Sequence, residues 1–298
     1  MNSSLKAHIY LFTAQVIYAL NYSIAKDLMP HHISPFGLVM LRILGAFILF
    51  WLVSFFTKSE KLEKGDLKKM MLLAVFGVSV NQLFFIWGLN LTKPINSAII
   101  MVSNPIAVML FTLFVFREKL TAQKLTGLTF GLVGALTLLL FKSHGSFSIG
   151  SDTIVGDLMT LVNSLSWAVF VVMAKPIMGK YKTVTVMKWI FLFGFLYMSP
   201  IGIPDLFKVH WSELSIETIS ALLFVVIATT FIVYFLNTYA LKTLSSSAVS
   251  MYIYLQPFLA TIIAVILGKD ELTVIKVISA SLIITGVYLA SKKKKELS

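Results

Sequence analysis

Residues 88–134 read GLNLTKPINSAIIMVSNPIAVMLFTLFVFREKLTAQKLTGLTFGLVG, and residues 240–286 read ALKTLSSSAVSMYIYLQPFLATIIAVILGKDELTVIKVISASLIITG. The second stretch follows the first at a constant offset of 152 positions, without a gap over 47 residues. Three matched features show the correspondence: Asn104 and Pro105 with Gln256 and Pro257, the charged turn 117–121 with 269–273, and Gly134 with Gly286. A series of this length indicates an internal duplication.

The composition indicates that most of the chain lies in a membrane. Of its 298 residues, 58% are hydrophobic and 13% are charged, whereas soluble domains have about 45–50% and about 25%. A membrane-spanning helix needs about 20 mostly apolar residues. The chain contains ten such runs: 7–25, 36–56, 70–91, 95–116, 125–141, 158–174, 183–203, 218–241, 245–268 and 277–291. This composition excludes a soluble globular enzyme, a DNA-binding domain and a disordered chain.

The ten runs divide into two sets of five, one in each copy of the duplication. Because five is odd, the second copy must enter the membrane from the opposite side. We therefore expect an all-α membrane protein whose ten transmembrane helices form two inverted five-helix repeats. The repeats span 1–143 and 152–298, joined by the Gly- and Ser-rich connection 144–151. Secondary transporters often have this plan, with the substrate held near the midplane between the repeats.

The basic residues predict the orientation of the chain. The connections on the side of both termini hold 17 of the 25 Lys and Arg residues, and the opposite connections hold six. Such an excess is typical of cytoplasmic loops, so both termini are expected in the cytoplasm. The net charge of +12 then belongs to the loops and to a basic tail at 292–295 that meets membrane lipids, and no nucleic-acid partner is expected.

Polar side chains inside the runs are candidates for a solute site, because polar groups at membrane depth usually face the protein interior. The predicted solute-binding residues are Tyr18, Asn21, Arg42, Gln82, Asn104, Asn163, Trp167, Asn237 and Gln256. Further polar or aromatic residues expected on the same interior faces are Gln15, Tyr22, Asn81, Phe85, Trp87, Ser164, Tyr234 and Tyr239. The offset of 152 pairs Gln82 with Tyr234 and Phe85 with Asn237, so these pairs should face the pseudo-symmetry axis from opposite sides.

Pro105 and Pro257 are expected to kink the fourth and ninth runs. A proline cannot donate to the carbonyl four residues earlier, which here belongs to Met101 or Ile253. In a membrane a freed carbonyl needs another partner or a water-lined cavity. One interpretation is a pair of gating hinges that present carbonyls to the substrate. The alternative is a kink that only shapes packing.

Four cations lie inside the runs or at their ends. Arg42 and Lys188 fall at comparable depths of the second and seventh runs, where each either attracts a carboxylate or phosphate of the solute or extends to the headgroups. Lys26 and Lys175 end the first run of each repeat. These two lysines are candidates for a gate, with an interface anchor as the alternative.

Several kinds of chemistry are missing from the sequence. There is no cysteine, no Walker loop and no HExxH motif, and none of the ten runs contains Asp or Glu. We therefore expect no enzyme activity, no metal site and no cofactor, although Asp157 at the edge of the sixth run could carry a proton. Gly127, Gly131 and Gly134 form a small-residue stripe on the fifth run. That stripe favours contact with the tenth run, and a homodimer is the alternative.

With these motifs the chain resembles the drug/metabolite transporter superfamily, in particular proteins with two EamA-type domains. The motifs that carry the resemblance are Tyr18 to Asn21 with Lys26, Leu41 with Arg42, Pro105 followed by the turn 118–120, and Pro257 followed by the turn 270–272. The resemblance implies a bacterial inner-membrane carrier that exports amino acids, other metabolites or drugs. It also implies a central cavity inside helices one to four and six to nine, with helices five and ten outside. Tyr18 stands where the family often has Trp, and Trp167 occupies the corresponding place in the second repeat.

The sequence thus predicts a secondary-active transporter, in the exporting direction, of a small organic solute such as an amino acid. Alternating access between inverted repeats is the predicted mechanism. Two other functions remain compatible with the same arrangement of ten helices: a channel or lipid scramblase, and a membrane scaffold or sensor that transports no solute.

Overall fold

The structure, a computed structural model, describes residues 3–58, 60–117, 121–142, 153–266 and 273–291. Every regular element in these ranges is a helix. Four predicted features lie outside the described residues: the connection 144–151, the turn positions 118–120 and 270–272, and the basic tail 292–295.

The first repeat contains five helical segments, of which the third includes a π-helical stretch and the fourth is broken. They are α1 (Ser3–Leu28), α2 (Pro35–Phe55), the continuous α3 (Asp66–Ala74), η1 (Val75–Ser79) and α4 (Val80–Leu91), the broken α5 (Pro94–Met101) and α6 (Asn104–Phe116), and α7 (Ala122–Lys142).

The second repeat has the same plan in the same order. Its segments are α8 (Ile154–Lys180), α9 (Thr183–Phe207), the continuous α10 (Ile216–Leu223), η3 (Phe224–Ile232) and α11 (Val233–Ala240), the broken α12 (Ser246–Met251), η4 (Tyr252–Tyr254) and α13 (Leu255–Ile266), and α14 (Val274–Ser291). A short 3₁₀ turn, η2 (Trp211–Glu213), lies between α9 and α10. The prediction of ten helical segments is confirmed.

Within the described chain, eight helices are long and apolar enough to cross a membrane, and 274–290 is a shorter apolar helix. The helix α1 is not among the eight, although it has 26 residues. It is less hydropathic because it carries polar residues such as Gln15 and Asn21, which are buried in the protein and do not face lipid.

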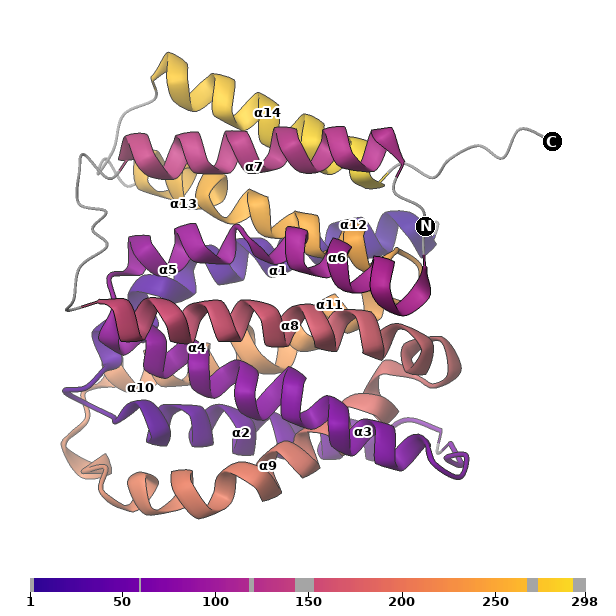
Figure 1. The fold of residues 1–298 in the computed structure, drawn as a ribbon. Coiled ribbons are helices and arrows are strands. Elements are labelled where there is room, and N and C mark those ends of the chain that lie inside the picture. The colour runs from indigo at the N-terminus through magenta and orange to yellow at the C-terminus, as the bar shows by residue number, and fades with distance from the viewer. Residues whose placement is uncertain (1–2, 59, 118–120, 143–152, 267–272, 292–298) are drawn as a thin grey trace.

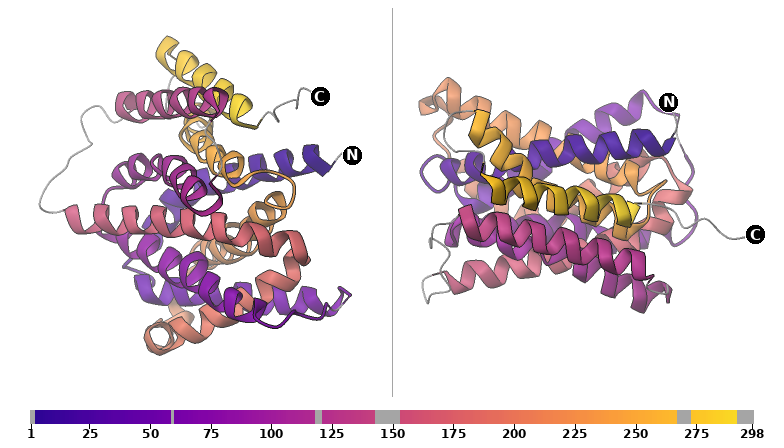
Figure 2. Two further views of the ribbon diagram at one scale, coloured as in Figure 1. Left: turned by 45° about the vertical axis from the view of Figure 1, so that its right-hand side comes forward. Right: turned by 90° about the horizontal axis from the view of Figure 1, so that it is seen from above.

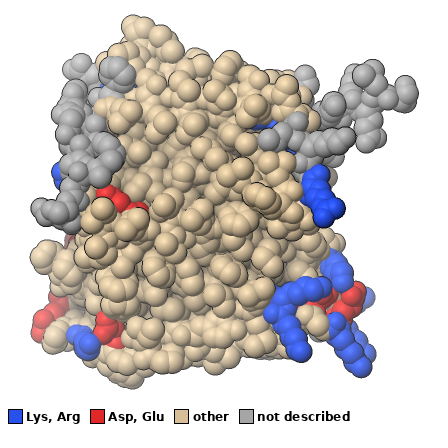
Figure 3. All heavy atoms as spheres, viewed as in Figure 1, with Lys and Arg blue, Asp and Glu red and all other residues tan. Residues whose placement is uncertain are grey.

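The two repeats run in opposite directions through the bundle. Figure 1 shows α1 and α8, the first helix of each repeat, crossing the molecule with opposite polarity. The end of α14 lies on the face where α1 begins (Figure 1). Lys and Arg side chains gather at that same face of the surface (Figure 3). The structure therefore has the inverted arrangement that an odd number of spans per repeat requires.

Helices α7 and α14 pack side by side at the edge of the bundle (Figures 1 and 2). A Cβ atom on Gly127 would lie 2.8 Å from the carbonyl oxygen of Gly286, and one on Gly286 would lie 2.6 Å from the carbonyl oxygen of Gly127. Only glycine permits this backbone approach. The predicted contact between the fifth and tenth spans is confirmed.

The third span of each repeat contains a π-helical stretch, η1 or η3, which the sequence did not predict. The offset of 152 places Val75–Ser79 on positions 227–231, inside Phe224–Ile232. A π-helix has more residues per turn than an α-helix and is frequent at functional sites. Because of the wider π-helical turns, the residues that follow in each third span point in a different direction around the helix axis than they would in a regular α-helix. These residues, in α4 and α11, contribute Gln82 and Tyr234 to the site described next.

Candidate functional site

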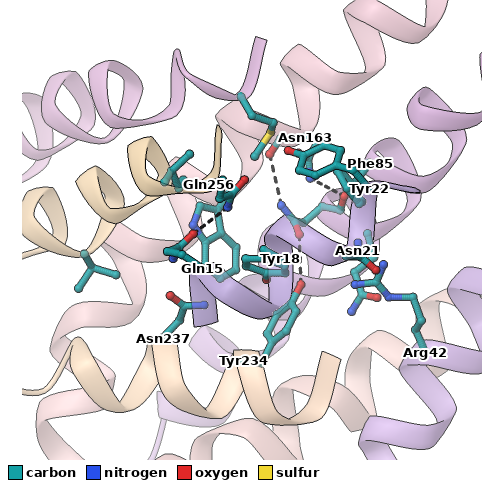
Figure 4. Close-up of a pocket in the computed structure, with 16 residues that line it drawn as sticks. Gln15, Tyr18, Asn21, Tyr22, Arg42, Phe85, Asn163, Tyr234, Asn237 and Gln256 are labelled. Atoms are coloured by element: carbon teal, nitrogen blue, oxygen red, sulfur yellow. Dashed lines mark hydrogen bonds between the residues drawn. The ribbon is translucent and has the colours of Figure 1, made fainter. Parts of the chain in front are cut away.

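A central cavity of about 60 Å³ lies between the two repeats (Figure 4). The side chains that line it come from α1, α2, α4, α5, α8, α11, α12, η4 and α13. Helices α7 and α14 contribute none of the described lining residues, as the resemblance implied for helices five and ten. The seventh span, α9, also contributes none, unlike what the resemblance implied.

Most of the predicted solute-binding residues meet in this cavity. Those that line it are Tyr18, Asn21, Arg42, Gln82, Asn163, Trp167, Asn237 and Gln256. Tyr18 lies near the middle of the group in Figure 4, with Arg42 on one side and Gln15 and Gln256 on the other. The paired positions Gln82 with Tyr234 and Phe85 with Asn237 all line it from both repeats, as their offset predicts.

Asn104 is the exception among the predicted binding residues, because it is buried behind the cavity wall. Its Nδ2 donates to the carbonyl oxygen of Ser164 on α8, over 2.7 Å. The amide therefore joins the break before α6 to the second repeat.

The breaks in the fourth and ninth spans fall where the prolines predict them. Helix α5 ends at Met101 and α6 begins at Asn104, while the 3₁₀ turn η4 separates α12 from α13. Met101 and Ile253, which lie four residues before Pro105 and Pro257, both line the central cavity. The duplication thus places two equivalent helix breaks beside the same central cavity.

Hydrogen bonds between amides hold the walls of the cavity together. Gln256 donates to Oε1 of Gln15 over 2.8 Å, which links α13 to α1. Asn163 on α8 donates to the carbonyl of Asn81 on α4 over 2.7 Å. The hydroxyl of Tyr234 lies 3.1 Å from Oδ1 of the same Asn81. Each of these bonds joins one repeat to the other.

Arg42 is the one cation among the described lining residues, and none of those residues is acidic. Its side chain is 3% exposed, and its Nε donates to Oγ1 of Thr230 over 2.9 Å. Within the described chain, Nη1 of Arg42 has no hydrogen-bond partner, and neither have Oδ1 of Asn21 and Oδ1 of Asn163. Buried polar groups of this kind normally find a partner. These three atoms belong to residues that line one cavity, and a cationic donor together with amide oxygens is complementary to a solute that carries both an anionic group and N–H donors.

Lys188 does not reach the central cavity. Its Nζ lies over the rings of Trp51 and Trp189, at 5.1 Å and 5.9 Å from their centroids. Cation–π contacts of this kind hold a lysine at an aromatic surface. The two intramembrane cations therefore have different environments, despite their similar places in the sequence.

Lys26 and Lys175 make equivalent contacts in the two repeats. Lys26 donates to the carbonyls of Leu89, Asn90 and Thr92, at the end of α4. Lys175 donates to the carbonyls of Leu241 and Leu244, at the end of α11. The offset of 152 places Leu89 on Leu241 and Thr92 on Leu244. Each lysine thus caps the C-terminus of the third span of its own repeat, where free carbonyls favour a cation.

Asp157 also lies outside the central cavity. Its carboxylate accepts from the Thr92 hydroxyl over 2.5 Å and from Nδ2 of Asn96 over 3.3 Å. These contacts join α8 to Thr92, just after α4, and to Asn96 in α5, so the described surroundings of Asp157 are those of a structural anchor.

Sequence reasoning found most of the cavity wall but not all of it. Of the residues expected on interior faces, the structure places Gln15, Tyr22, Asn81, Phe85 and Tyr234 in the cavity. Trp87, Ser164 and Tyr239 do not line it; Trp87, for example, packs on Phe36 with ring centroids 5.0 Å apart. Val249 lines the cavity without having been expected. An apolar residue in an apolar run carries no signal that could have singled it out.

Comparison with known proteins assigns the chain to a family. The model of the EamA-like transporter family matches residues 5–140 and again residues 154–292. An uncharacterized transporter of Archaeoglobus fulgidus is 26% identical over 99% of this chain and 100% of its own length. The uncharacterized transporter YyaM of Bacillus subtilis is 25% identical over 78% of this chain and 77% of its own. A solved crystal structure shares the fold at 19% identity, with a TM-score of 0.75 and 96% of both chains covered.

Proposed function

Because this chain belongs to the EamA-like transporter family, and is therefore a multi-pass membrane transporter rather than an enzyme, we propose that it is a secondary-active exporter of a small organic solute. An amino acid or a related carboxylate is the proposed class of solute. The single observation that carries this class is the buried guanidinium of Arg42, whose Nη1 is unpaired beside the cavity.

The proposed binding mode follows from the unpaired atoms of the cavity. A carboxylate of the solute accepts from Nη1 of Arg42, because a charge-assisted bond is the strongest that this cavity offers. An ammonium group donates to Oδ1 of Asn21 and Oδ1 of Asn163, which lack other partners in the described chain. Since no described lining residue is acidic, a purely cationic solute would be repelled by Arg42.

The proposed mechanism is alternating access between the inverted repeats. The broken spans α5–α6 and α12–α13 are equivalent in the duplication and border the same cavity. Bending at Pro105 in one repeat and at Pro257 in the other would open the cavity to opposite faces in turn. The small volume of the cavity supports a cycle in which it widens before solute enters. The outward direction of transport is supported by the resemblance to exporters.

The experiment is counterflow in liposomes that contain the purified full-length protein. Vesicles loaded with one unlabelled amino acid should accumulate the same amino acid, in labelled form, transiently above its external concentration. Folding is checked by size-exclusion chromatography in detergent before reconstitution. Absence of counterflow for every amino acid and carboxylate tested would overturn the proposal, and rapid flux without counterflow would favour a channel.

We further propose that the protein lies in the inner membrane of a bacterium with both termini in the cytoplasm. The excess of basic residues on the connections that share a side with the termini supports this orientation, and the relative YyaM of Bacillus subtilis is bacterial. A reporter active only in the cytoplasm, fused after Ser298, should be active. Activity of a reporter that works only outside the inner membrane would reverse this orientation.

A further inference from the structure

A second cavity adjoins the first. It has a volume of about 230 Å³ and lies between α1, α5, α7 and the broken ninth span, η4 with α13. We call it the lateral pocket. Tyr22, Ile253 and Gln256 line both the lateral pocket and the central cavity. The two spaces therefore adjoin each other at these three residues.

The two spaces differ in chemistry. The lateral pocket is lined mainly by apolar groups, among them Ala19, Ile95, Ala98, Leu139 and Ala260, and none of its described lining residues is charged. The central cavity holds Arg42 and several amides. A polar space and an apolar space that adjoin each other at Tyr22, Ile253 and Gln256 suit a molecule that has one end of each kind.

The volumes of the two spaces also fit a molecule with a small polar end and a larger apolar end. A water molecule needs roughly 10–15 Å³ of such volume, so the central cavity, at about 60 Å³, has room for roughly four to six waters. That space suits the carboxylate and ammonium groups of an amino acid but not a large side chain as well. The lateral pocket is nearly four times as large and adjoins the central cavity at Tyr22, Ile253 and Gln256.

We infer that the lateral pocket is an apolar subsite, which takes the hydrocarbon side group of an amphipathic carboxylate while Arg42 and the amide oxygens bind its polar head. This inference rests on the proposed function and adds to it the class of solute: amino acids or carboxylates with a branched or aromatic side group. Tyr22 and Gln256 stand at the boundary, where a polar head gives way to an apolar group.

The shape of the pocket can be changed from two sides with single substitutions. Ala98 on α5 and Ala260 on α13 are half-buried and line the lateral pocket, and neither lines the central cavity. Ala98→Leu and Ala260→Leu each add three carbon atoms to the pocket. Ala280→Leu on α14 is the matched control, because Ala280 is also half-buried and lines neither space.

The test compares counterflow of glycine, alanine, leucine and phenylalanine, and of the matching carboxylates without the amino group, in liposomes. The unmodified protein should transport leucine and phenylalanine better than glycine. Filling the pocket should lower counterflow of the two larger solutes by about tenfold, the usual effect of a few methylene groups on hydrophobic selectivity. Counterflow of alanine should stay within about twofold, and Ala280→Leu should behave like the unmodified protein.

The outcomes separate this inference from the proposed function. If the unmodified protein exchanges glycine as well as leucine, or if both pocket variants lower all solutes equally, the subsite does not exist and the carrier proposal stands. An equal reduction of all solutes is also what a pocket filled by a lipid chain would give. If the unmodified protein exchanges no solute at all, the carrier proposal itself fails.

Discussion

Arg42 on α2 donates its Nε hydrogen to Oγ1 of Thr230 over 2.9 Å, across the boundary between the two repeats. Thr230 in turn donates to the carbonyl of Val225, five residues earlier in the π-helical stretch η3. This carbonyl is within reach because of the wider π-helical turn. The position of the cation in the central cavity therefore depends on an irregular stretch of the opposite repeat.

Replacement of Arg42 by alanine should abolish most of the transport, because it removes the cationic donor proposed to bind the solute carboxylate. We expect counterflow to fall at least about 30-fold, which corresponds to a charge-assisted hydrogen bond of about 2 kcal/mol. Lys188→Ala is the matched control, since that cation contacts Trp51 and Trp189 outside the cavity. Equal transport by the two variants would remove Arg42 from the site.

Thr230→Val should have a smaller effect of the same kind. The substitution keeps the volume but removes the acceptor of the bond from Arg42 Nε, so the guanidinium loses its orientation and keeps its charge. A loss of about threefold to tenfold in counterflow is expected, in line with a net hydrogen-bond contribution of about 1 kcal/mol. Combined with Arg42→Ala, Thr230→Val should cause no further loss. Additive effects in the double variant would mean that the two residues act separately.

Pro105→Ala and Pro257→Ala should slow transport and stabilise the protein. Alanine supplies the N–H that the carbonyls of Met101 and Ile253 lack, and it favours a continuous helix. We expect turnover to fall several-fold, while the melting temperature in detergent rises. Pro200→Ala in α9 serves as the control, because Pro200 lies within a helix and is exposed, away from the cavity. Unchanged turnover in both variants would restrict the kinks to a packing role.

Lys26→Met and Lys175→Met should each destabilise the fold. Both remove a cation from the carbonyls at the end of a third span. The expected loss is about 1.5–3 kcal/mol per lysine, the usual contribution of hydrogen bonds to charged groups, and it is measurable as a lower melting temperature. Lys64→Met, at an exposed position in the connection before α3, should leave stability unchanged. A stable Lys26→Met protein that no longer transports would instead indicate a gate.

Gly286→Leu should lower stability without changing selectivity. The new side chain would meet the backbone of Gly127 and Gly131 on α7, and overpacking of this kind costs about 1–3 kcal/mol. Because α14, which carries the substitution, contributes no described residue to the central cavity or to the lateral pocket, the ratio of leucine to glycine counterflow should be preserved in the folded fraction. Gly179→Ala is the control, as a Cβ there has nothing within 4 Å. A shift in selectivity would show that this helix pair communicates with the cavity.

Much of this architecture could be predicted without coordinates. The hydropathy of the runs, the offset of 152 and the odd number of spans per repeat are properties of the linear sequence, and together they predict ten helices in inverted halves. The prolines predicted both breaks for the same reason, since a missing N–H is a property of the residue itself. Gly127, Gly131 and Gly134 likewise predicted the close contact of the fifth and tenth spans.

Other features depended on where side chains point. Asn104 and Gln256 precede equivalent prolines, yet only Gln256 lines the cavity, and Arg42 and Lys188 lie at similar depths in different surroundings. Helix periodicity places a residue on a stripe, but the rotation of that stripe depends on packing against neighbouring helices and on local irregularities such as η1 and η3.

The sequence by itself determined that the chain crosses a membrane repeatedly and that its second half is an inverted copy of its first, because apolar length and repetition are encoded residue by residue. Only the tertiary structure decided that Arg42 lines the central cavity while Lys188 and Asn104 do not, and that an apolar pocket adjoins it at Tyr22 and Gln256. Those relationships arise from helix rotation and from contacts between residues far apart in the chain, which no local pattern specifies.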